Sequence, residues 1–218
     1  MSLWASSVLS LFLLQTASPQ DQPVNADTRP LVVEEAAAPS LPSPPAAELP
    51  RPLSFKKDWS LMQGYSDAYG ILSKENGCSS FYGGPRAATT VLNALVTHVK
   101  AEQLYREISF QMGGKLQIIR DTSANVLYRL FDRTTVNSIG SFYQRRSDPM
   151  RNIPADVGSF LPGSRVARVL ILLHELGHLI QGENGDWLLP DDGFDGQKSK
   201  ANSLRVEQIC RAQLTALN

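Results

Sequence analysis

His174, Glu175 and His178 combine the residue types that hold a metal ion and use it in catalysis. Residues four apart on a helix lie on the same side, with roughly 5–6 Å between their Cβ atoms, so both imidazoles could reach one ion. Zinc suits neutral imidazoles and a carboxylate, and catalytic sites keep one position open for water. Glu175 could accept a proton from that water as it attacks a carbonyl. The segment therefore predicts metal-assisted hydrolysis.

The surroundings of this segment favour a metal site. The chain has three histidines, and two of them lie here, within an apolar stretch where unpartnered polar side chains would be costly. A stretch rich in carboxylates, residues 182–200, follows and could supply another ligand. The alternative is a hydrogen-bonded pair of core histidines, which predicts no bound metal. The third histidine, His98, is expected on a helix surface.

The segment lies on a predicted helix that begins after Ser164, a residue suited to capping it. Most of its apolar residues recur at helical spacing along one side of the helix, and Leu172 and Leu179 lie on another side. They are Val166, Val169, Leu170, Leu172, Leu173, Leu176, Leu179 and Ile180. A helix that is apolar nearly all round belongs in the interior of a domain. Gly182 is expected to end it.

Weaker patterns predict the elements around this helix. Pro85 is suited to the first position of a helix that is expected to run to about Glu107. The pair Gly113–Gly114 breaks the pattern, and residues 116–119 suggest a short strand. Residues 125–143 fit either strands or a helix followed by a strand.

A last helix is expected over residues 202–217. Its candidate apolar positions are Leu204, Val206, Ile209, Cys210 and Leu214. Residues 54–218 are enough for one core. They predict a single α+β domain in which the buried metal-bearing helix packs on a small sheet.

The N-terminal region predicts export. Residues 1–18 have an apolar core, Val8 to Leu14, followed by small residues, as a secretory signal does. This core is too short to span a bilayer, so no stable membrane span is expected. Residues 19–53 hold most of the 14 prolines and no aromatic residue, which predicts a disordered linker. The expected location is secreted or periplasmic, in the cell envelope.

Cysteine content and charge limit the partners and the compartment. In an exported protein, Cys78 and Cys210 favour one disulfide between an early segment and the last helix. Two buried free thiols are the alternative. Lys plus Arg and Asp plus Glu both total 21, and the net charge of zero gives no sign of a nucleic-acid partner. The sequence does not indicate an oligomeric state.

The segment from His174 to His178 resembles the active-site helix of the zincin metallopeptidases. The wider stretch resembles a group of exported bacterial proteins of unestablished function. They share the five residues, an acidic turn, an Asn and a final Cys, here residues 190–193, Asn202 and Cys210. The resemblance to the zincins implies a zincin-like fold, bound Zn²⁺, a peptide or protein substrate and Glu175 as the catalytic base.

The resemblance leaves the third metal ligand open. One zincin group has a His or Asp six residues after the second histidine, where this chain has Asn184. Others use a Glu on the following helix or an Asp in a nearby loop. The candidates here are Asp191, Asp192, Asp195 and Glu207. We expect Asp192, because Gly193 allows a tight turn that could aim its carboxylate at the helix.

A second hypothesis keeps the metal and omits the reaction. Tyr82, Tyr143 and Arg205 could each stabilise an oxyanion, but their spacing selects none of them. The chain would then be a non-catalytic exported or envelope protein whose zincin-like metal site has a structural or binding role.

Overall fold

The computed structural model describes residues 48–54, 58–105, 108–144 and 156–217. The predicted signal and residues 19–47 of the predicted linker lie outside these ranges. Within them, five helices and three strands follow one another. They are α1 (Trp59–Leu72), α2 (Gly77–Phe81), α3 (Pro85–Thr97), β1 (Val99–Glu102), β2 (Phe110–Asp121), β3 (Val126–Asn137), α4 (Arg165–Leu179) and α5 (Gly196–Thr215). The α+β class is as expected.

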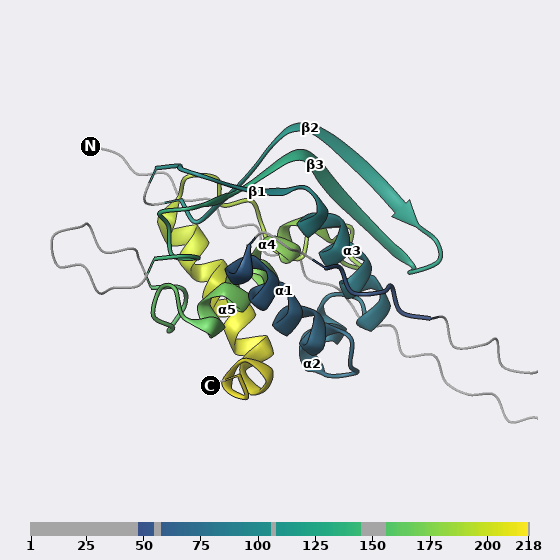
Figure 1. Cartoon of the computed structure of the whole chain (residues 1–218). Coiled ribbons are helices and arrows are strands. Elements are labelled where there is room, and N and C mark those ends of the chain that lie inside the picture. The colour runs from purple at the N-terminus through teal and green to yellow at the C-terminus, as the bar shows by residue number, and fades with distance from the viewer. Residues whose placement is uncertain (1–47, 55–57, 106–107, 145–155, 218) are drawn as a thin grey trace, which may run out of the picture. The chain divides into compact units, whose positions relative to one another are not determined.

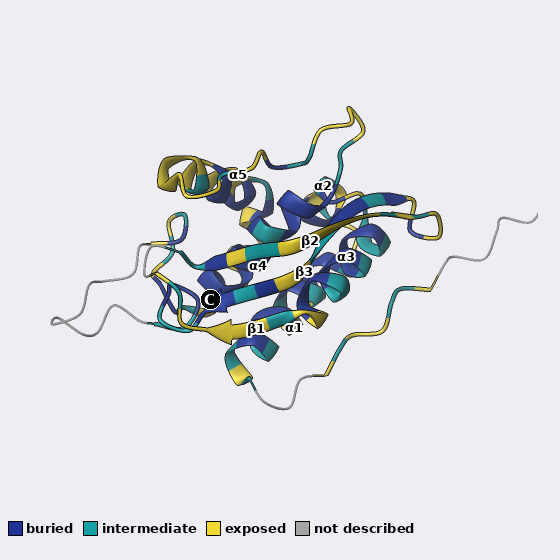
Figure 2. Ribbon diagram, turned by 90° about the horizontal axis from the view of Figure 1, so that it is seen from above, coloured by how far each residue is buried: buried dark blue, intermediate teal, exposed yellow. Residues whose placement is uncertain are grey.

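The three strands form one sheet in the order β1-β3-β2, which lies to one side of the helices (Figure 1). The central strand β3 pairs in parallel with β1 and antiparallel with β2. Figure 2 shows more buried residues along β3 than along β2, which forms an edge of the sheet. Residues 125–143 therefore contain a strand, the first of the two expected alternatives.

Helix α4 is the core of the fold, as its apolar sequence predicts. Arg165 and Glu175 are the two of its 15 residues that are not buried. It packs against α1, α3, α5 and β3. The hydroxyl of Ser164 caps its N-terminus and accepts a hydrogen bond from the backbone N–H of Ala167 at 3.1 Å.

The end of α4 differs from the prediction at Gly182. The helix ends at Leu179, because Ile180 takes an extended conformation with φ −95° and ψ 133°. Ile180 then pairs with Tyr128 of β3, and the N–H of Gln181 donates to the carbonyl of Leu127 at 3.0 Å. The sheet therefore ends the helix before the glycine is reached.

Two predictions between residues 97 and 121 are wrong. The helix from Pro85 ends at Thr97, well before Glu107, because residues 99–102 pair with β3 as strand β1. A partner strand outweighs weak helical periodicity over so short a stretch. Gly113 and Gly114 do not precede a strand but lie inside β2, where the register shifts and Gly114 has φ +84°.

Helix α5 begins at Gly196, six residues before the predicted Asn202, because Asp195 caps it. Leu204, expected in the core, is 43% exposed. The buried side of α5 is a stripe at helical spacing that includes Ser203, Val206, Cys210 and Leu214. In the part of the chain described, no helix combines the length and the apolar character needed to cross a membrane.

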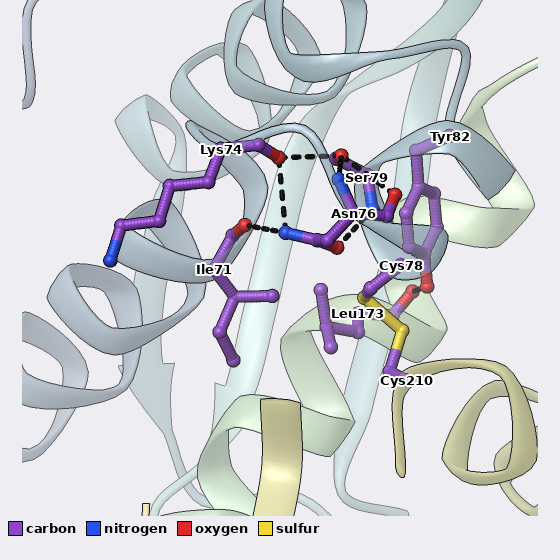
Figure 3. The surroundings of a disulfide bond; sticks show 8 residues. All are labelled: Ile71, Lys74, Asn76, Cys78, Ser79, Tyr82, Leu173 and Cys210. Carbon is purple, nitrogen blue, oxygen red and sulfur yellow. Dashed lines mark hydrogen bonds between the residues drawn. A yellow bond between two sulfur atoms is a disulfide. The ribbon is translucent and has the colours of Figure 1, made fainter. Parts of the chain in front are cut away.

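A disulfide between Cys78 and Cys210 joins α2 to α5, as the cysteine content favours (Figure 3). Asn76 caps α2 by accepting a hydrogen bond from the N–H of Ser79 at 2.9 Å. Beside the disulfide, the hydroxyl of Tyr82 donates to the carbonyl of Leu173 in α4 at 2.7 Å (Figure 3). The short helix α2 is thus attached to both α4 and α5.

The end of the predicted linker packs on the folded domain. The N–H of Leu53 donates to the hydroxyl of Tyr65 at 2.7 Å, and the hydroxyl of Tyr69 donates to the carbonyl of Pro50. The amide of Asn93 in α3 donates to the carbonyl of Arg51 at 3.0 Å. Residues 50–53 therefore belong with the domain, which the sequence boundary at residue 54 leaves out.

Candidate metal centre

Three donor atoms meet at the C-terminal half of α4. Nε2 of His174 lies 3.0 Å from Nε2 of His178 and 3.0 Å from Oδ2 of Asp192, and the remaining pair is 3.5 Å apart. Tetrahedral zinc with bonds of about 2.0–2.1 Å requires ligand atoms about 3.3 Å apart. The donor set and its spacing thus fit a zinc ion, and the group could hold a metal.

The helix sets the relation between the two histidines. His174 and His178 stand four residues apart on α4, and their rings meet edge to face with centroids 4.8 Å apart. They are 5% and 3% exposed. Two polar rings so deep in the core need partners for their nitrogens, and the Nε2 atoms find them in each other and in Asp192.

The segment after α4 turns back along the helix and carries Asp192 to the histidines. The N–H of Leu189 donates to the carbonyl of Gly177 at 3.0 Å, and the N–H of Leu188 to that of Ile180 at 2.9 Å. These two carbonyls at the helix end have no partner inside the helix. The amide of Asn202 in α5 holds the carbonyl of Pro190 at 3.0 Å. Hydrogen bonds to the end of α4 and to α5 thus fix the segment just before Asp192.

Gly177 allows this close approach. A Cβ atom at this position would lie 2.6 Å from two side-chain atoms of Leu189. Leu189 is fully buried, so it has no free space to move into. The glycine within the His-Glu-Leu-Gly-His segment is therefore required by the packing of the segment that carries Asp192.

The turn after Asp192 forms as Gly193 predicts. Gly193 has φ +52°, and the N–H of Asp195 donates to the carbonyl of Asp192 at 2.8 Å. Asp195 then accepts hydrogen bonds from the N–H groups of residues 197 and 198. Asp195 therefore caps α5 and is not one of the residues at the candidate metal centre.

The remaining candidate acids are also engaged elsewhere. Asp191 pairs with the guanidinium of Arg129. Glu207 is buried, and it accepts hydrogen bonds from the N–H and hydroxyl of Ser159 at 2.8 and 2.6 Å and from Arg211 at 3.1 Å. Of the four acids considered from the sequence, Asp192 is the one that the fold brings to the histidines.

Arg129 joins β3 to helix α4, a link that the sequence did not indicate. Its Nε donates to the carbonyl of His178 at 2.7 Å, and its guanidinium lies 4.4 Å above the ring of Trp187. The same guanidinium binds Asp191. Asp191 thus pairs with Arg129, while the neighbouring Asp192 faces the histidines.

The outer nitrogens of the two histidines differ in their partners. Nδ1 of His174 lies 3.0 Å from the hydroxyl of Ser203 in α5. Nδ1 of His178 is buried and has no hydrogen-bond partner among the residues described. Ser203 was missed from the sequence. The stripe of α5 that holds Cys210 and Leu214 could have indicated it, since that spacing also turns Ser203 inward.

Opposite charges at the site shift the pKa values of two of its members. Burial alone would lower the pKa of His178, but the hydrogen bond with Asp192 and the charges of Glu175, Asp192 and Asp191 raise it. Burial alone would raise the pKa of Asp192, but hydrogen bonds with His174 and His178 lower it well below its ordinary range. In the metal-free protein the acid and the two rings thus stabilise one another.

Glu175 lies beside these donors on α4. It is partly exposed, whereas its neighbours His174 and Leu176 are buried. Within the described residues, its carboxylate accepts no hydrogen bond. Burial among protein atoms raises the pKa of Glu175, while the charges of His174 and His178 act against this and that of Asp192 adds to it. Solvent therefore reaches α4 at the residue expected to act as base.

The residues considered for an oxyanion do not converge on this site. Tyr82 is fully buried and binds the carbonyl of Leu173. The hydroxyl of Tyr143 binds Asp58, and Arg205 lies over the ring of Phe81.

His98 is the C-cap of α3 and is exposed, as expected for a surface histidine.

The chain matches no protein-family model, and neither a curated protein nor a solved structure shows significant similarity to it.

Proposed function

We propose that this protein is an exported zinc-dependent hydrolase, and most specifically a metallopeptidase with a zincin-like site. The observation that carries the proposal is the spacing of three donor atoms, 3.0 to 3.5 Å apart, on His174, His178 and Asp192. Two imidazoles and one carboxylate are a ligand set of catalytic zinc sites, and the fourth position is left for water.

The roles of the residues follow from their positions. When bound, zinc makes water more acidic and a carbonyl more electrophilic. Glu175 is next to a ligand, is partly exposed and has no hydrogen-bond donor on it among the described residues, so its Oε atoms are free to take a proton from water. Glu175 would then pass that proton to the leaving nitrogen.

The substrate class and the location complete the proposal. A peptide substrate is proposed because the segment resembles the zincin helix, whereas the chemistry of the residues by itself supports metal-assisted hydrolysis in general. The disulfide between Cys78 and Cys210 supports an oxidising compartment, in agreement with the predicted signal over residues 1–18.

Glu175→Gln is the direct test. The amide keeps the size of the side chain and cannot act as a base, so we expect full zinc content by elemental analysis. We expect a loss of about 100-fold or more in cleavage of a fluorogenic peptide library. Glu183→Gln is the matched control, since Glu183 is exposed and lies in the loop after α4. A wild type without stoichiometric zinc, or an active Glu175→Gln, would refute the proposal.

One observation favours the second candidate, a non-catalytic metal site. Both histidines are at most 5% exposed, and structural zinc sites are closed to solvent. In this case the ion would hold α4 to the segment carrying Asp192. Full zinc content without cleavage of any peptide, together with a large loss of thermal stability on chelation, would select this candidate.

A further inference from the structure

The hydroxyl of Ser203 contacts the metal centre from outside its donor set. It lies 3.0 Å from Nδ1 of His174, and both side chains are buried. The hydroxyls of Thr89, Thr97 and Thr215 each bond back to a carbonyl of their own helix. Ser203 instead reaches from α5 to α4. The contact joins two helices at the ring nitrogen opposite the one that faces Asp192.

We propose that Ser203 is a positioning residue of the metal centre, which holds the His174 ring with Nε2 aimed at His178 and Asp192. This rests on the metal-binding part of the proposed function and is independent of hydrolysis. A neutral histidine that binds an ion through Nε2 carries its hydrogen on Nδ1, and a hydroxyl oxygen accepts it. Partners of this kind fix the tautomer and orientation of the ring, and their loss costs about 10–100-fold in metal affinity.

No described residue provides the Nδ1 atom of His178 with a partner of the kind that Ser203 provides for His174. Among the described residues, Nδ1 of His178 has no partner, so its ring is held from the Nε2 side by His174 and Asp192. The two rings are therefore unequal before an ion binds, and His174 is the oriented one. Without the Ser203 hydroxyl, no described residue would be a partner for the Nδ1 atom of either ring.

The position of Ser203 is itself fixed by its neighbours on α5. The amide of Asn202 holds the carbonyl of Pro190, in the segment that carries Asp192. Cys210 lies two helical turns further along the same buried stripe and is bonded to Cys78. The hydroxyl is thus presented by a helix that is tied to the metal centre on one side and to α2 on the other.

The test is a titration of the full-length chain with Zn²⁺ and Co²⁺ against a competing chelator. We expect Ser203→Ala to weaken binding by about 10–100-fold and Ser203→Thr, which keeps the hydroxyl, to restore most of it. Ser199→Ala is the matched control on α5, one turn earlier, and should bind as the wild type does. A wild type that binds neither ion refutes the metal centre itself. Equal affinity of the wild type and Ser203→Ala refutes the role of Ser203 alone.

A measurement on the wild type keeps the proposal testable if Ser203→Ala does not fold. In zinc-loaded protein with ¹⁵N-labelled histidine, NMR should place the metal on Nε2 of His174 and a hydrogen on Nδ1. Metal on Nδ1 of His174 would overturn the proposal, because that nitrogen is the one that faces Ser203.

Discussion

The backbone N–H of Leu189 donates to the carbonyl of Gly177 at 3.0 Å, and the side chain of Leu189 fills the space that a Cβ on Gly177 would need. This contact fixes the segment that ends in Asp192. It creates a requirement for glycine inside α4, although glycine is a poor helix former there.

Gly177→Ala should therefore improve local helix propensity, by about 1 kcal/mol, and yet weaken the metal centre. The added methyl group would displace Leu189 and the segment behind it, and we expect zinc affinity to fall about 10–100-fold. The matched test is Gly177→Ala combined with Leu189→Ala, which removes the clash and should regain part of the affinity. An unchanged affinity in Gly177→Ala would contradict this account.

Asp192→Asn should lower zinc affinity at least about 100-fold, because a neutral amide replaces a charged ligand while the shape is kept. Asp191→Asn is the control for charge in the same turn. It removes the pair with Arg129 and should lower zinc affinity by less than about tenfold, because Asp191 is largely exposed and an exposed ion pair contributes little. Equal losses in the two variants would show that the turn acts through its net charge and not through a ligand.

Stabilisation by zinc should grow as the pH rises. The pKa of His178 is raised in the metal-free protein, so its proton competes with the ion at pH values above the ordinary range near 6.5. Protonated His178 stabilises the metal-free protein at low pH, and this contribution is lost as the pH rises through the raised pKa. The increase in Tm on adding zinc should therefore be larger at pH 8 than at pH 6. Thermal unfolding at both values checks this, and a larger increase at pH 6 would contradict it.

Cys78→Ser combined with Cys210→Ser should lower the free energy of unfolding by about 3–5 kcal/mol. The bond closes a loop with a sequence separation of 132, and loops of this length give large entropic effects in the chain-entropy model. Denaturant unfolding of the double variant, compared with oxidised wild type, provides the measurement, and reduced wild type is the control. Identical stability of oxidised and reduced wild type would show that packing alone holds α2 to α5.

The parts of the site that depend on local sequence could be predicted. The spacing of His174 and His178 follows from the helix period, and the apolar residues around them predicted the burial of α4. Gly193 indicated a turn, and the turn forms directly after Asp192, whose carboxylate lies 3.0 Å from His174.

The parts that depend on distant contacts could not be predicted. Ser203 and His174 are 29 residues apart, and Arg129 and the carbonyl of His178 are 49 apart. No local pattern encodes such a pairing. The same cause explains the error at β1, where pairing with β3 turned the residues after Thr97 into a strand.

Helix α5 is the last element described in chain order, so its contacts with the site form after the other residues of the site have been made. During synthesis, the three donor residues leave the ribosome before α5, which carries Ser203 and Cys210. Cys78 leaves earlier still, and it can form its disulfide only after Cys210 has been made. A chain in which α5 has not yet been made would thus carry the three donor residues without the contacts of Ser203 and Asn202. Assembly of the candidate site is in this way coupled to synthesis of α5 and to formation of the disulfide.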